Sequence, residues 1–477
     1  MKLKDRLVIM DNRNSLIKEA PVINRTNHFL ATPPYVLVVM LLTVIANVFS
    51  AELVVYTFFA LVAIYTCLLG NDLLPLMPLF IGGYLAPSVE NNPGRNEVSV
   101  FSGYSGIYLA CLSVCIVAAL IFRLIKDKQR FFTAKPILLS GMLVLLGAYL
   151  LSGIGSAAYP EAIAKNLFFA LLQGAAIILP YWLFSCGVNW KNVRKDYFAW
   201  IGFATGGVLI CQILWIYYSG NVIVDGIIHR KYIFTGWGMY NNIGAMLAMM
   251  TPYAFCLASK YRKGWIGTVV GSIFLICLLL TCSRSSILTG IAGYCVCVIL
   301  MLYHAKNRKH NTIALISISV VILLTIIFFR DQLLRLFSGL INKGLDPSSR
   351  DDIYVQGLKS FTKAPIFGNS FFPTGYQPWA WYTTEGFGKI FPPRWHNTIV
   401  QLLAGCGIVG LAAYILHRVQ TIRLFLQHKT KENRFIACSL LILLVASMFD
   451  CHFFNIGPVL FYSMALAFAE NRPESNN

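Results

Sequence analysis

Arg284 lies in the short stretch 281–286, which joins two apolar segments with almost no loop. A guanidinium group can bind two oxygens of one phosphate, so an arginine at this position suits the recognition of an anion. An arginine this close to an apolar environment is costly and tends to mark a site. The alternative is a side chain that only extends to reach lipid headgroups.

A second basic group, Arg230 and Lys231, lies in the connection 219–239. These two side chains could bind an anion, or they could be solvated charges of a loop. Asn241 and Asn242 follow at the start of the next apolar segment and could simply cap a helix there.

The third group, Trp395-His396-Asn397, ends the polar segment 330–396 at the point where an apolar run begins. An imidazole titrates near neutral pH and can accept a proton from a hydroxyl. A lone histidine at a helix start could instead be a capping or packing residue. Together with Arg284 and Arg230, however, His396 forms a set that suits a lipid diphosphate leaving group and a sugar hydroxyl.

Segment 330–396 is long for a connection, and aromatic residues crowd its second half. A loop of this length with so many special residues is usually functional. Trp379, Trp381 and Trp395 could stack on sugar rings or could form an interfacial belt. Asp351-Asp352 suits a helix N-terminus better than a metal site, and we expect neither a metal nor a cofactor.

The composition is that of a membrane protein. The chain has 477 residues, of which 57% are hydrophobic and 12% charged, with a mean hydropathy of +0.65. A soluble domain carries roughly 25% charged residues. Apolar runs of about 17–25 residues recur, each long enough to cross about 30 Å as a helix, and such continuous runs exclude the alternating strands of a barrel. We therefore predict an all-α polytopic membrane protein with about 12–14 transmembrane helices and one large extracytoplasmic loop before the last helices.

These helices divide the chain into five parts. We expect an N-terminal tail over 1–33, a helix bundle over 34–329, the loop over 330–396, C-terminal helices over 397–470 and a short tail over 471–477. The expected spans lie near 34–50, 52–70, 72–86, 105–125, 136–156, 164–186, 197–218, 240–259, 265–282, 286–303, 312–329, 397–416, 435–450 and 455–469.

The formal net charge of +19 could indicate a nucleic-acid partner, but the Lys and Arg residues lie mostly at helix ends. Connections such as 123–135 and 417–434 are rich in Lys and Arg, whereas 87–104 and 157–165 are poor in them. By the positive-inside rule both termini are cytoplasmic and the loop 330–396 is extracytoplasmic. We therefore expect membrane lipids, and no nucleic acid, as partners.

Several motifs, in this order along the chain, resemble those of the O-antigen ligases and the related O-antigen or exopolysaccharide polymerases. They are Tyr240-Asn241-Asn242-Ile243-Gly244, Thr281-Cys282-Ser283-Arg284-Ser285, Ser348-Ser349-Arg350, Pro365-Ile366-Phe367-Gly368, and Trp395-His396-Asn397 followed by Gly405, Gly407 and Gly410. One departure is Gly368-Asn369-Ser370, where the family more usually has Gly-x-Gly.

The resemblance implies a metal-independent glycosyltransferase in the bacterial cell (inner or plasma) membrane. It would move a glycan from a polyprenyl-diphosphate carrier to a glycan or lipid-linked hydroxyl acceptor on the extracytoplasmic face. Arg284 and Arg230 would bind the donor diphosphate, and His396 would act as base toward the acceptor hydroxyl or position it. Arg350 would contact phosphate or anchor the loop, and Lys231, Asn397 and Trp395 would complete the substrate site.

Whether such an enzyme is a polymerase or a ligase depends on the acceptor, which the sequence leaves open. A flippase for lipid-linked oligosaccharide is the main alternative. That class predicts polar or charged residues inside several spans, and the spans here are largely free of charge. A structural membrane scaffold is a third interpretation, but it gives no role to the arginines and the histidine.

Overall fold

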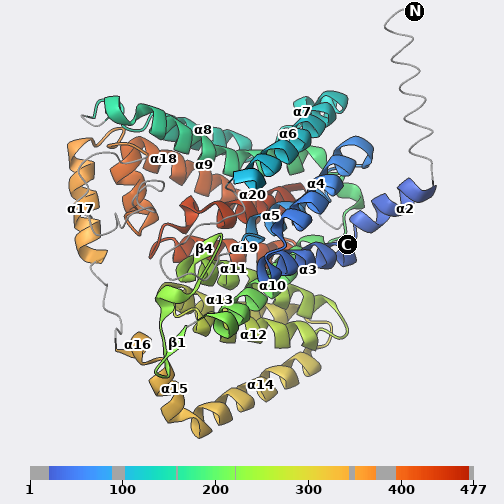
Figure 1. The fold of residues 1–477 in the computed structure, drawn as a ribbon, viewed down its shortest axis with the longest axis vertical. Coiled ribbons are helices and arrows are strands. Elements are labelled where there is room, and N and C mark those ends of the chain that lie inside the picture. The colour runs from blue at the N-terminus through green and yellow to red at the C-terminus, as the bar shows by residue number, and fades with distance from the viewer. Residues whose placement is uncertain are drawn as a thin grey trace, which may run out of the picture.

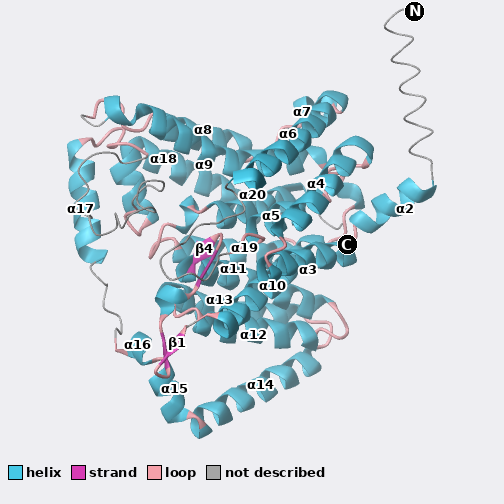
Figure 2. Cartoon of the chain, in the orientation of Figure 1, coloured by secondary structure: helices cyan, strands magenta, loops and turns pink. Residues whose placement is uncertain are grey.

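The computed structural model describes residues 21–88, 103–156, 159–220, 222–342, 350–371 and 394–471. Helices make up most of these residues, and two small hairpins are the strands seen among them (Figures 1 and 2). The chain is an all-α polytopic membrane protein, as its composition predicts.

The elements up to residue 219 are helical. They are α2 (Pro21–Leu30), α3 (Pro33–Phe49), α4 (Glu52–Leu69), α5 (Leu76–Leu85), α6 (Gly103–Lys126), α7 (Lys128–Thr133), α8 (Leu139–Leu150), α9 (Tyr159–Gly187), the 3-10 turn η2 (Trp190–Asn192) and α10 (Tyr197–Ser219). The two hairpins follow, with antiparallel pairing in each. They comprise β1 (Ile223–Val224), β2 (Ile227–Ile228), β3 (Phe234–Thr235) and β4 (Gly238–Met239), with η3 (Arg230–Tyr232) between the pairs.

The second half of the chain returns to helices. They are α11 (Tyr240–Lys260), α12 (Trp265–Leu280), α13 (Arg284–His304), α14 (Arg308–Phe328), α15 (Arg330–Leu336), α16 (Ser338–Ile341), α17 (Arg350–Lys363), α18 (Thr398–Gln427), α19 (Lys431–Ala446), η5 (His452–Phe454) and α20 (Ile456–Asn471).

Each expected span contains a helix, but fewer of these helices are long enough to cross a membrane than the sequence predicts. Among the described residues, eight are long and apolar enough, or up to nine if α2 and α3, bent by 71°, form one span. The helices α5, α8, α12, α19 and α20 have 10 to 16 residues. At about 1.5 Å per residue they are shorter than about 30 Å of hydrocarbon. Apolar runs in the sequence include the turns that flank these short helices, so they overestimate helix length.

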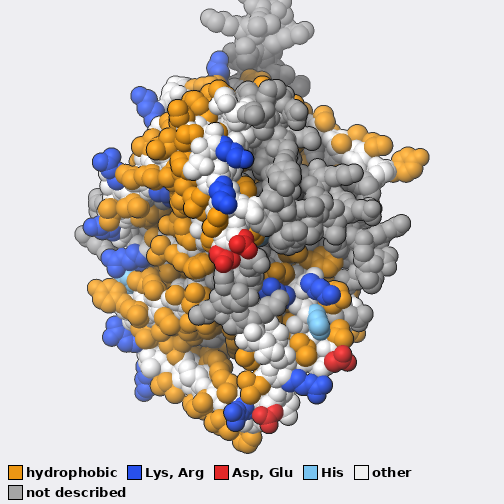
Figure 3. Space-filling view, turned by 90° about the vertical axis from the view of Figure 1, so that its left-hand side faces the viewer, with side chains coloured by type: hydrophobic (Ala, Val, Ile, Leu, Met, Phe, Trp, Pro, Cys, Tyr) orange, Lys and Arg blue, Asp and Glu red, His pale blue; other side chains and the backbone are white. Residues whose placement is uncertain are grey.

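Helix α11 forms the centre of the bundle. In its most apolar stretch of 18 residues, 94% of the residues are buried, and α10, α12, α13 and α19 pack around it. By contrast, only 11% of the residues in the corresponding stretch of α6 and 6% in that of α14 are buried, so these helices lie at the periphery. On the face shown in Figure 3, hydrophobic side chains cover much of the described surface, as expected where lipid is the solvent.

Helices α11, α13 and α19 place their basic termini at one end of the bundle. The Lys431 ammonium, at the start of α19, donates to the carbonyl of Ser259 near the end of α11 at 2.9 Å and to that of His304 at the end of α13 at 3.1 Å. Because α19 runs antiparallel to the other two, the beginnings of α11 and α13 meet the end of α19 at the opposite end. That opposite end carries the candidate site.

A break in α18 positions the segment that re-enters the bundle. Gly407 has φ +65°, and the helix continues on both sides of it. The Ile408 N–H donates to the Pro365 carbonyl at 2.9 Å, while the Ala404 carbonyl, which would otherwise accept that bond, accepts from the Asn369 N–H at 2.9 Å. A Cβ at Gly407 would lie 2.3 Å from the Ile366 carbonyl oxygen, so glycine is required there.

Candidate active site

His396 lies just before α18, but it does not cap the helix. Asn397 is the cap: its Oδ1 accepts from Ile399 N at 2.8 Å and Val400 N at 3.1 Å, and its Nδ2 donates to the Met448 carbonyl at 2.8 Å. Both polar groups of Asn397 are therefore engaged in structure. His396 has φ +51°, an unusual conformation for a residue other than glycine. The cap thus leaves the imidazole available for a tertiary contact.

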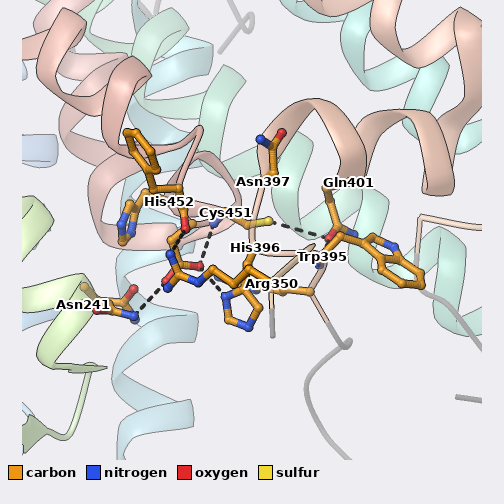
Figure 4. Close-up of polar contacts among 12 residues, drawn as sticks. Asn241, Arg350, Trp395, His396, Asn397, Gln401, Cys451 and His452 are labelled. Carbon is orange, nitrogen blue, oxygen red and sulfur yellow. Dashed lines mark hydrogen bonds and ion pairs between the residues drawn. The ribbon is translucent and has the colours of Figure 1, made fainter. Parts of the chain in front are cut away.

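That contact is with Asp450, which follows α19, and Figure 4 shows His396 near Arg350 and Cys451 in this region. The His396 Nδ1 lies 3.1 Å from the Asp450 Oδ1, and the His396 side chain is 22% exposed. Burial alone would raise the pKa of Asp450, but the hydrogen bond to His396 and nearby cationic groups, including Arg350, hold it well below its usual range. An ionised Asp450 fixes the proton of His396 on Nδ1, which makes Nε2 the proton acceptor of the neutral ring.

Asn241 connects Asp450 to the short connection that carries Arg284. The Asn241 Nδ2 donates to the Asp450 Oδ2 at 3.0 Å, and the Ser283 Oγ donates to the Asn241 Oδ1 at 2.9 Å. Ser283 is the N-cap residue of α13, and Arg284, half-buried, is the first residue of that helix. Three successive contacts therefore lead from His396 to the residue beside Arg284. The asparagine does not cap α11, whose cap position is Met239.

Gly244 allows α11 to approach the 281–286 connection closely. A Cβ at Gly244 would lie 2.9 Å from the Ser286 Cβ and 3.0 Å from the Thr281 Oγ1. These distances are shorter than ordinary carbon contacts, so a larger residue would push the two segments apart.

Arg230 lies next to this same connection. Its guanidinium carbon is 5.1 Å from the centre of the Tyr240 ring. Burial raises the pKa of the Cys282 thiol, and the positive charge of Arg230 offsets part of that rise. Arg230 therefore lies near the start of α11 and near the residues that precede Arg284. Lys231 is exposed, and its ammonium is 4.9 Å from the centre of the Tyr232 ring in the same loop.

Arg350 fastens the start of α17 to the site. Its Nη1 donates to the Phe449 carbonyl at 2.6 Å, directly before Asp450. The sequence suggests two roles for Arg350, a contact with phosphate or an anchor of the loop, and the bond to Phe449 is a contact of the second kind. The charge of Arg350 also stabilises the Asp450 carboxylate.

Trp395 does not offer its ring as a surface for a sugar. The side chain is 8% exposed and packs with Ile353, Val400 and Ala404 between α17 and α18. A Cβ at Gly357 would lie 3.2 Å from the indole, so the absence of a side chain there makes room for the ring. The structure thus replaces the expected stacking contact by a packing contact. Trp379 and Trp381 lie outside the described residues.

A second series of hydrogen bonds, which the sequence does not predict, lies beside the series from His396 to Ser283. Asn455 Nδ2 donates to the Asn242 Oδ1 at 2.6 Å, and Arg394 donates to the Asn455 Oδ1. Arg394 also donates to the Phe454 carbonyl at 3.2 Å. The His452 Nδ1 lies 3.4 Å from the Asn455 Nδ2. Burial lowers the pKa of His452 to about 4, so this ring is neutral near pH 7. Adjacent asparagines of α11 thus each hold one part of the 450–455 connection.

Asp450 is a residue of the candidate site that the sequence did not predict. The only signal was its position, because Asp450-Cys451-His452 interrupts an apolar run and a carboxylate in such a run is costly without a partner. Nothing in the local pattern shows that the partner is His396, which lies 54 positions away. Within the described ranges, no group of three or more His, Cys, Asp or Glu side chains converges to hold a metal ion.

Comparison with known proteins identifies one domain. Residues 269–415 match a family model described as O-antigen ligase. No curated protein matches the chain. The matched range contains Arg284, Arg350 and His396 but neither Asn241 nor Asp450, so the contacts described above join the matched domain to segments before and after it.

Proposed function

We propose that this chain is an enzyme of the O-antigen ligase type, on the match of residues 269–415 to that family model, and that it transfers a glycan from a polyprenyl-diphosphate carrier to a hydroxyl acceptor. The observation that carries this proposal is the series of contacts from His396 through Asp450, Asn241 and Ser283 to the start of α13 at Arg284. It brings a proton acceptor and a phosphate-binding group to one end of the bundle.

We place the reaction at the extracytoplasmic face of a bacterial cell membrane. The basic ends of α11, α13 and α19 lie together at one end of the bundle, and the site lies at the other. The positive-inside rule assigns the basic end, and with it both chain termini, to the cytoplasm. A glycan exported on a lipid carrier would then reach the site from outside.

In the proposed reaction, the acceptor hydroxyl oxygen forms a bond to the anomeric carbon as the bond to the diphosphate oxygen breaks. The His396 Nε2 takes the hydroxyl proton, while Asp450 keeps the Nδ1 proton in place and stabilises the imidazolium that results. The diphosphate leaves with the bonding electrons. Arg284 and Arg230 stabilise the negative charge that develops on it, so they favour the transition state over the bound donor.

Because a diphosphate is a good leaving group, we propose a transfer without a covalent enzyme intermediate and without a metal. The acceptor decides between two forms of the reaction. A second glycan as acceptor makes the protein a polymerase, and a lipid-anchored or other hydroxyl makes it a ligase.

The decisive test is reconstitution of the purified protein in vesicles with a synthetic polyprenyl-diphosphate oligosaccharide. Longer glycan chains on the carrier indicate a polymerase, and glycan on a different acceptor indicates a ligase. We expect transfer to continue in excess EDTA. Intact donor moved across the bilayer, with no new glycosidic bond, would show a transporter and refute the proposal.

A further inference from the structure

Helix α14 is separated from the bundle by an apolar groove. A cavity of about 240 Å³ lies between α12 and α14, and among the described elements α14 packs mainly on α12 and less on α13 and α15. The α12 side of the groove includes Ile273 and Ile276, and the α14 side includes Ser317, Ile318, Val321 and Ile322. Apolar surface of this kind in a membrane protein favours an apolar chain as occupant.

A separate cavity lies further along α14, toward the end of the bundle that carries the candidate site. This second cavity, of about 200 Å³, lies where α14 bends into α15 and α16, lined by Ile326, Arg330, Leu333, Leu334, Phe337 and Ile341. Residues 318, 322, 326 and 330 are spaced by four, so they share one face of a helix. The stripe from Ser317 to Arg330 is about 20 Å long at about 1.5 Å per residue, and it ends in a guanidinium group.

The outer end of this groove is connected to the candidate site through the first hairpin. The Arg335 Nη2 of α15 donates to the Asp225 carbonyl in the turn between β1 and β2 at 3.0 Å, and α15 and α16 pack on β2. Arg230 follows two residues after β2 and lies over Tyr240, the neighbour of Asn241. Figure 1 shows α14 at the edge of the molecule, with α15 and α16 beside β1.

We propose that the groove along α14 binds the isoprenoid chain of the donor, and this rests on the proposed function. The donor has an apolar chain that ends in an anion, and the groove has the same order: an apolar stripe, then Arg330, then Arg230 and Arg284. An ordinary phospholipid has the same order of apolar chain and anion, so the test below varies the carrier chain itself.

The test uses one glycan on two carriers, a long polyprenyl diphosphate and a two-isoprene diphosphate. Ile318→Trp and Ile322→Trp fill the groove, and Ile316→Trp is the matched control because Ile316 is 59% exposed and outside the groove lining. We expect the groove variants to lower the preference in kcat/KM for the long carrier over the short one by about tenfold, because buried chain surface is lost. The control should keep the wild-type preference.

An unchanged preference in both groove variants, or an equal loss in Ile316→Trp, would overturn the groove assignment. A photoreactive group near the far end of the long carrier gives a second measurement that does not need turnover. It should label α12 and α14, and labelling confined to other helices would also overturn the assignment. If the wild-type protein transfers glycan from neither carrier, the proposed function fails, and the labelling result still decides whether the chain occupies the groove.

Discussion

The Asn241 amide donates to the Asp450 carboxylate at 3.0 Å, across 209 positions of sequence. This contact joins the first turn of α11 to the connection between α19 and α20. Asp450 in turn holds His396, and the other side of the Asn241 amide holds Ser283. One asparagine therefore fixes the relative positions of the histidine and of the helix that begins at Arg284.

Replacing His396 by alanine removes the proton acceptor. We expect His396→Ala to lower kcat for glycan transfer by about 10²–10⁴-fold, which is the usual contribution of a general base. The assay is transfer in vesicles at matched protein content. His310→Ala is the control, because His310 is exposed and contacts Asn307 at the start of α14. Near-normal turnover by His396→Ala would exclude the base role.

Replacing Asp450 by asparagine should cost activity and should make stability depend differently on pH. The pKa of Asp450 in the folded protein lies below that of an unfolded aspartate, about 3.9. Its stabilising contribution is therefore complete above the unfolded pKa and is lost as pH falls through the lower, folded value. The difference in Tm between wild type and Asp450→Asn should shrink as pH falls below about 4, where the carboxylate takes up its proton. A difference that keeps growing below about pH 4 would contradict this assignment.

Asn241→Asp introduces a second carboxylate within hydrogen-bond distance of Asp450. Two such groups cannot both ionise easily, so one should retain a proton near neutral pH. The hold on His396 should then weaken, so its imidazolium is stabilised less and the pH–rate profile should shift toward lower pH. Asn241→Ala removes the bridge without adding charge and should lower activity with a smaller shift of the profile. Identical profiles for the two variants would show that Asn241 does not act through the carboxylate.

Arg284 should not tolerate lysine. A lysine keeps the charge but cannot form the two parallel hydrogen bonds of a guanidinium with a phosphate. We expect Arg284→Lys and Arg284→Ala both to lower kcat/KM for the donor, by about 10²–10³-fold for the alanine variant. Arg423→Lys, on the basic part of α18 away from the site, should retain activity. Full activity of Arg284→Lys would indicate a point charge rather than bidentate binding.

Gly407→Ala tests the break in α18. The added Cβ would meet the Ile366 carbonyl, and φ +65° disfavours any residue with a side chain. We expect a loss of stability of at least about 1–2 kcal/mol, measured as a lower Tm of the purified protein. Gly147→Ala in α8 is the control, since a Cβ there meets nothing within 4 Å and alanine favours a helix. Equal Tm values for the two variants would contradict the tight contact at Gly407.

The sequence predicts the helices and draws attention to Arg284 and His396, because those signals are local. Apolar length marks a helix, and the unusual positions of Arg284 and His396 draw attention by themselves. The role of Asn241 was not predictable, because an asparagine at a helix start is as suitable for a cap as for a bridge. Its partner Asp450 is brought near only by the packing of α19 against α11.

The packing of Trp395 was not predictable for a related reason. An aromatic residue at the edge of an apolar run has the same sequence signature whether it faces a sugar, a lipid headgroup or another helix. What decides is Gly357 on α17, which leaves room for the indole. A contact between a glycine of one helix and a tryptophan beside another leaves no repeating pattern in the sequence, so it cannot be predicted from one sequence.

The break in α18 has a mechanical consequence. Residues 364–370 supply the backbone partners that the helix itself lacks around Gly407, so this segment and residues 398–406 are held together as a single body. His396 is attached to the leading edge of that body through the Asn397 cap. Any movement of residues 364–370 relative to α18 must therefore either carry the histidine with it or first separate those shared backbone bonds.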